Sequence, residues 1–95
     1  MNVLITAATS AEAHRLKNHL SADNVILGDY QEMPVFMQIL KLPNPASLSY
    51  AHEMLTLCLD KEIGMVYAFG KEELNNLLEA EQLFIEYGIE VVHRP

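Results

Sequence analysis

The sequence predicts an α/β domain built on a five-stranded parallel sheet. Its opening, residues 1–12, combines a short apolar run, a tight loop of small residues and the start of an amphipathic helix. The apolar runs that follow are apolar on both faces, which is typical of parallel strands covered by helices. With 95 residues, of which 51% are hydrophobic, the chain is expected to fold as one domain with one core, residues 1–95.

The first strand and the first helix are predicted from this opening. Residues 2–7 are expected to form a strand, because the run is apolar and contains β-branched residues. A helix is expected from about Ser10 to Leu20. Thr9 and Glu12 match the T-x-x-E capping box, in which each side chain bonds the backbone N–H of the other residue. The expected buried face of this helix is Ala13, Leu16 and Leu20.

Two strands and a helix are predicted in the middle of the chain. Residues 25–29 form one strand, and a less regular apolar stretch places the other within residues 36–41. The helix is predicted to begin at Asn44 and Pro45, because asparagine is a good N-cap and proline suits the first helical position. It is expected to end near Glu62. Its apolar face is Leu48, Ala51, Leu55 and Cys58, flanked by Met54 and Leu59.

The last third is predicted to be strand, helix and strand. The strands cover residues 65–69 and 89–92, and Gly70 turns the chain into the helix, whose first-turn acids favour the helix dipole. Glu81 interrupts the apolar side of this helix, so the helix is either kinked or split in two. Gly88 is its expected C-terminal cap. The expected apolar face is Leu74, Leu77, Leu78, Phe84 and Ile85.

This order of elements predicts the topology of the sheet. Right-handed crossovers between parallel strands give a Rossmann-like three-layer sandwich with strand order 3-2-1-4-5. The topological switch point, where such folds bind ligands, then lies between the first and fourth strands. The candidate ligand-binding residues on the loops at this edge are Ala8, Thr9, Ser10, Asp29, Gly70, Lys71 and Glu72.

Charge and cysteine content exclude several classes of function. The formal net charge is −7, from six Lys and Arg against thirteen Asp and Glu, so nucleic acid and anionic membranes are not expected partners. The single cysteine, Cys58, rules out an internal disulfide and is expected to be buried and unreactive. The apolar runs are too short to span a bilayer, and no basic segment precedes the first of them. A cytoplasmic protein of bacterial type is expected.

Taken together, five segments of the chain resemble one known family. They are LITAATS (4–10), VILGDYQEMP (25–34), FMQILKLPNPAS (36–47), GMVYAFGKEEL (64–74) and EYGIEVV (86–92). At these spacings they resemble the pre-ATP-grasp domain. That domain is the small Rossmann-like N-terminal domain of ATP-grasp enzymes such as carbamoyl phosphate synthetase and biotin carboxylase. The resemblance implies that ATP and the catalytic Mg²⁺ ligands belong to an ATP-grasp domain, against which this domain would pack.

The residues of the first loop argue against nucleotide binding. The family's loop is often glycine-rich, whereas Ala7 and Thr9 stand at the matching positions here. The Glu12 carboxylate would repel a phosphate at the helix N-terminus by roughly 1–4 kcal/mol. Asp29 follows a strand where a ribose-binding acid would, but without the glycines it is interpreted as a solvated loop carboxylate. No cofactor is expected.

Metal binding and catalysis have no recognisable motif in the sequence. His14 and His19 are five residues apart and do not share a helix face, and the neighbours His52 and Glu53 lie on different faces. Cys58 has no nearby base, and no G-x-S-x-G elbow occurs. No metal site and no catalytic residue are therefore predicted, and the chain is not expected to be an enzyme.

The expected edge strand suggests how the chain acts. Its apolar residues invite pairing with another chain unless a helix covers them, and both outcomes remain open. The expected function is a non-catalytic binding or subunit module, which forms a homo-oligomer such as a dimer or docks to a separately encoded ATP-grasp ligase. The alternative is a domain that binds a small ligand or nucleotide at the switch-point loops. The candidate interface residues are Phe36, Met37, Ile39 and Leu40.

Overall fold

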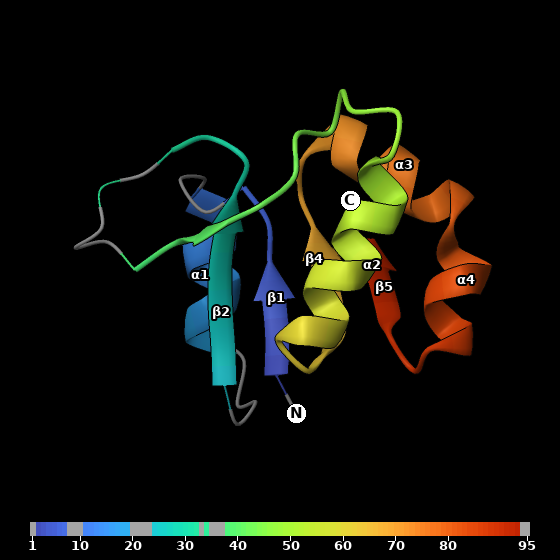
Figure 1. Cartoon of the computed structure of the whole chain (residues 1–95). Helices are drawn as coiled ribbons and strands as arrows, with labels where there is room; N and C mark the ends of the chain where they lie inside the picture. The colour runs from blue at the N-terminus through green and yellow to red at the C-terminus, as the bar shows by residue number, and fades with distance from the viewer. Residues whose placement is uncertain (1, 8–10, 20–23, 33, 35–37, 94–95) are drawn as a thin grey trace.

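The computed structural model (Figure 1) describes residues 2–7, 11–19, 24–32, 34 and 38–93. The strands are β1 (Asn2–Ile5), β2 (Asn24–Asp29), β3 (Leu40–Lys41), β4 (Ile63–Ala68) and β5 (Glu90–His93). The helices are α1 (Ala11–His19), α2 (Tyr50–Asp60), α3 (Lys71–Glu79) and α4 (Glu81–Glu86).

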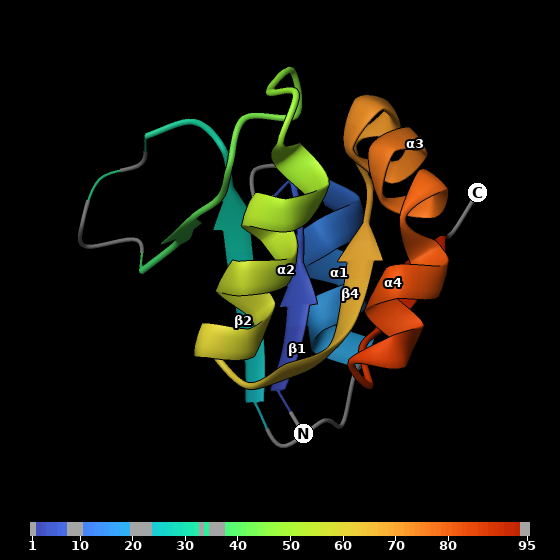
Figure 2. The same cartoon turned by 45° about the vertical axis from the view of Figure 1, so that its right-hand side comes forward.

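The predicted sheet is confirmed. Its strand order is β3-β2-β1-β4-β5, and every pair of neighbouring strands is parallel. Leu4 at the centre pairs with Ile26 on one side and Val66 on the other. Helix α1 lies on one face of the sheet and α2, α3 and α4 lie on the other (Figures 1 and 2), which is what right-handed crossovers require. The fold is the expected Rossmann-like α/β/α sandwich.

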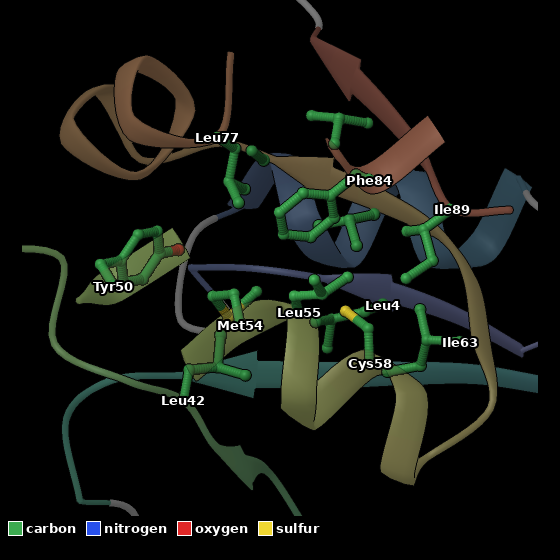
Figure 3. Packing of buried hydrophobic residues seen from close by; sticks show 13 residues of the cluster. Leu4, Leu42, Tyr50, Met54, Leu55, Cys58, Ile63, Leu77, Phe84 and Ile89 are labelled. Atoms are coloured by element: carbon green, nitrogen blue, oxygen red, sulfur yellow. The ribbon is translucent and has the colours of Figure 1, made fainter. Parts of the chain in front are cut away.

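The main core lies between the sheet and the three helices α2, α3 and α4 (Figure 3). The alternation of side chains along β1 sends Leu4 into this core, and Val3 and Ile5 are buried toward α1. Cys58 is buried in the core, as predicted, and burial raises the pKa of its thiol to about 12. The largest side chains of this core are Tyr50, Phe84, Leu4, Met54, Leu77 and Ile89.

The predicted start of the second helix is wrong. Asn44 caps a turn instead of the helix: its side-chain oxygen accepts from the Ala46 N–H at 2.9 Å, and its backbone carbonyl accepts from the Ser47 N–H. Helix α2 begins six residues after Asn44, with Ser49 as its N-cap. Leu48 therefore precedes the helix and is fully exposed rather than part of its apolar face. Leu59, expected to flank that face, is also exposed.

The predicted third strand is shorter than expected in the described residues. Only Leu40 and Lys41 form β3, which pairs with the end of β2. Leu42, just after the strand, is buried in the core beneath α2. Of the expected strand, residues 36 and 37 lie outside the described residues, as does Thr9 of the predicted capping box.

The split of the last helix is confirmed, and its predicted face is partly wrong. Helices α3 and α4 are separate, with Ala80 between them, and Leu77 and Phe84 are buried as expected. Leu78 and Ile85 are exposed instead, because the break at Ala80 and the position of α4 against β5 leave them on the outer side.

Gly88 ends α4 as predicted. Its φ is 77°, the Gly88 N–H donates to the Ile85 carbonyl, and the Ile89 N–H donates to the Phe84 carbonyl, which is the Schellman pattern. We expect Gly88→Ala to lower the free energy of unfolding by about 1 kcal/mol, because an L side chain resists this backbone conformation. A Cβ at this position would contact nothing, so the cost is purely conformational. Urea unfolding measures it, and Gly88→Asn should cost less than alanine; equal losses would contradict this account.

Candidate functional site

The carboxyl ends of β1 and β4, where the switch point lies, are joined by the protein's own hydrogen bonds. Thr6 directly follows β1 and is completely buried. Its N–H donates to the Tyr67 carbonyl at 3.0 Å, and its Oγ1 accepts from the Phe69 N–H at 3.0 Å. These bonds prolong the contact between the two strands beyond their last paired residues. Thr6 thus fastens the end of β1 to the end of β4, at the edge where such folds bind ligands.

Glu73 fills the space at the start of α3. It is the third residue of the helix and is only 4% exposed. Its carboxylate lies back over the N-cap, Gly70, where an added Cβ would come within 2.5 Å of Oε1. A side chain at position 70 would force this carboxylate to move, so glycine leaves room for Glu73 in its present position. The helix N-terminus, which can bind an anion in other proteins, is occupied here by the protein's own acid.

Tyr50 joins Glu73 from the first turn of α2. Its hydroxyl donates to Glu73 Oε2 at 3.4 Å, and both side chains are buried. Burial, followed by the charges of Asp29 and Glu72, raises the pKa of Glu73 to about 7, and the Tyr50 hydrogen bond opposes this shift. Burial and the neighbouring Glu73 charge raise the pKa of Tyr50 above its ordinary value, so Tyr50 stays a hydrogen-bond donor.

Asp29 completes this group, and its interpretation as a solvated carboxylate is wrong. It is the last residue of β2 and is 6% exposed, because β3 flanks it: its carbonyl accepts from the Leu42 N–H at 2.9 Å. Its Oδ1 accepts from the Gln31 N–H at 3.0 Å. We name Asp29, Tyr50 and Glu73 the carboxylate cluster. Within the described part of the chain, neither acid pairs with a Lys or Arg side chain.

Only some of the predicted ligand-binding residues can be placed near one another. The structure brings Asp29 and Gly70 to the same edge of the sheet, and Lys71 and Glu72 follow in the exposed first turn of α3. Three residues lie outside the described residues: Ala8, Thr9 and Ser10.

Sequence reasoning missed Glu73, although a signal was present. Glu73 precedes Leu77 by four residues and therefore shares the inward face of α3 with it. The preference of acids for the first turn of a helix predicts exposed residues, which fits Glu72, whereas Glu73 is buried.

A groove opens beside the β3 edge of the sheet, between this strand and α2. Its volume is about 560 Å³. Leu42, Pro43 and Leu57 give it an apolar lining, and exposed polar residues of α2 form one wall. Of the predicted interface residues, Ile39 and Leu40 are half-buried next to the groove, and residues Phe36 and Met37 lie outside the described residues. The lining residues are Lys41, Leu42, Pro43, His52, Glu53, Thr56, Leu57 and Asp60.

The described residues hold neither a metal-binding group of side chains nor a membrane-spanning helix. No group of three or more His, Cys, Asp and Glu side chains in this part of the chain is placed to hold a metal ion. None of the described helices has the length and apolar character needed to cross a membrane.

Comparison with known proteins adds no relative. No protein-family model matches the chain, and no curated protein matches it. The resemblance to the pre-ATP-grasp domain remains a prediction from the sequence segments that carry it.

Proposed function

We propose that this chain is a non-catalytic Rossmann-like binding or subunit module that acts by associating with another protein chain. The partner is a second copy of the chain or a separately encoded ATP-grasp ligase. The main support for the proposal is the described part of the switch point, where Thr6 joins the ends of β1 and β4 and Glu73 lies over the start of α3. A groove of the described residues lies away from the switch point, beside β3.

Charge at the switch point argues against a phosphate-bearing ligand. Asp29 and Glu73 are buried acids without a cationic partner among the described residues. A phosphate near the N-terminus of α3 would face these acids across a few ångströms, at a cost of roughly 1–4 kcal/mol for each ionised neighbour. The carboxyl-end edge of the sheet thus repels phosphate, the group that Rossmann-like folds usually bind there.

The edge of the sheet supports an association role. In the described residues β3 pairs on one side only, with β2, and a strand edge is a ready template for another chain. The resemblance of the whole chain to the pre-ATP-grasp domain supports an ATP-grasp chain as one partner.

A small-ligand role is the second candidate. It is favoured by one observation, that Asp29 and Gly70 lie at the same edge of the sheet as the exposed first turn of α3. Such a ligand would have to be neutral or cationic to suit the two buried acids.

Thermal unfolding with nucleotides separates these roles. We expect MgATP or NAD, at millimolar concentration, to leave the Tm unchanged, because Asp29 and Glu73 make the switch-point edge acidic. A ligand present at 100 times its Kd would add about 2.7 kcal/mol and raise the Tm of so small a domain by more than about 10 °C. Such a rise with either nucleotide would overturn the association role as the primary function.

A mixing experiment tests the hetero-complex directly. The chain and an ATP-grasp ligase chain of the same organism are run together by size exclusion. Co-elution, or a change in ligase activity, supports the ATP-grasp partner. Separate elution with unchanged ligase activity would rule out an ATP-grasp ligase as the partner.

A further inference from the structure

The α2 wall of the groove carries a row of polar side chains that is complementary to itself. His52, Thr56 and Asp60 follow each other at intervals of four residues, so they form one row along the helix, and all three are exposed groove-lining residues. An imidazole stands at one end of the row, a carboxylate at the other and a hydroxyl in the middle. If two such helices lie antiparallel with Thr56 beside Thr56, each histidine faces an aspartate.

Glu53, the other acid of this wall, is already engaged within its own chain. Its Oε2 accepts from the Ser47 hydroxyl at 2.8 Å and from the Ser49 hydroxyl at 3.0 Å. These bonds hold its carboxylate at the start of α2, so Asp60 is the free acid of the groove wall. The same antiparallel arrangement places Glu53 near Leu59 of the other helix, an apolar side chain that is 46% exposed.

The edge strand makes the same region available to a second chain. The Leu42 N–H donates to the Asp29 carbonyl, so in the parallel ladder the backbone N–H and carbonyl of Lys41 are directed away from β2. Lys41 also lines the groove. Apolar lining, a free strand edge and the polar row of α2 therefore occupy one surface.

We propose that a second copy of this chain docks on this groove, with the two α2 helices antiparallel about a two-fold axis beside Thr56 and His52 of each copy bonded to Asp60 of the other. The inference rests on the proposed association function and names its partner and surface. An isologous interface must be complementary to itself, and the opposite ends of the row meet that requirement. A partner of a single charge sign would match only one end of the row.

Sedimentation equilibrium of the full chain with matched variants tests this dimer. We expect the wild type to approach twice its 10.7 kDa mass as its concentration is raised. His52→Asp places two acids opposite each other at both ends of the row and should raise the dimer Kd by about tenfold or more. The exchange His52→Asp with Asp60→His reverses the row and keeps it complementary, so it should return the Kd to within about threefold of the wild type.

His14→Asp is the control, because it makes the same substitution on an exposed position of α1, on the opposite face of the sheet. All these positions are exposed, and circular dichroism verifies that each variant is folded. A wild type that stays at 10.7 kDa overturns the inference. A dimer unaffected by His52→Asp, or not restored by the exchange, also overturns it while leaving association as the function. Loss of the proposed function itself would appear separately, as stabilisation by MgATP or NAD.

Discussion

Glu73→Gln is expected to raise the free energy of unfolding at about pH 8 by up to about 3 kcal/mol. The wild-type carboxyl is buried beside Asp29, and its pKa is raised from 4.5 to about 7. A difference of this size between folded and unfolded states corresponds to about 3 kcal/mol. Glutamine fills nearly the same volume, and its side-chain oxygen can accept the hydrogen bond from the Tyr50 hydroxyl. Because it carries no charge, it avoids the cost of a buried carboxylate at high pH.

The direction of the pH dependence follows from the raised pKa. The folded state holds the Glu73 proton more tightly than the unfolded state, so this group's stabilisation is complete below about pH 4.5 and is lost as the pH rises through about 7. Urea unfolding of wild type and variant at about pH 5 and pH 8 gives the change in the free energy of unfolding with pH for each protein. The contributions of the other titrating groups cancel when the two changes are subtracted. Glu79→Gln, an exposed acid at the other end of α3, is the control and should follow the wild type. Parallel pH profiles for Glu73→Gln and wild type would contradict the burial of this acid.

Phe84→Ala is expected to lower the free energy of unfolding by about 3–5 kcal/mol. The Phe84 side chain is fully buried between α4 and the sheet (Figure 3), and its removal leaves a cavity that the surrounding core fills only in part. Ile85→Ala, at the next residue of the same helix, is a matched control, because Ile85 is 53% exposed and should cost less than about 1 kcal/mol. Urea unfolding compares the two variants. Similar losses for both would mean that α4 is not seated on β5 as the structure has it.

The sheet was predictable because its determinants are local and strong. Runs apolar on both faces mark central parallel strands, and the handedness of crossovers then leaves few strand orders. The start of α2 was not predictable in this way, because asparagine followed by proline begins helices and turns alike. The turn is held by a distant residue: the Asn76 side-chain amide on α3 donates to the Pro45 carbonyl at 2.7 Å. No local pattern contains that contact.

The candidate site was predictable in place and not in chemistry. The switch-point edge follows from the topology, and Asp29 and Gly70 lie there. The burial of Asp29 depends on the register of β3, which pairs Lys41 with Asp29 and brings Leu42 beside it; the predicted strand order places the third strand next to the second but does not fix this register. The burial of Glu73 could have been predicted from its spacing to Leu77. Charged residues are, however, rarely buried, so the usual rule predicts an exposed side chain.

Backbone amide NMR spectra of the labelled chain test the central claim most directly, because they report on the switch-point edge and the groove together. We expect dilution to shift the amides of Lys41 and Thr56, at the groove, and MgATP to leave those of Thr6, Phe69 and Gly70, at the switch-point edge, unchanged. The account would be contradicted if the amides of Thr6, Phe69 and Gly70 shifted with MgATP while those of Lys41 and Thr56 did not change with protein concentration. That result would favour a ligand-binding domain.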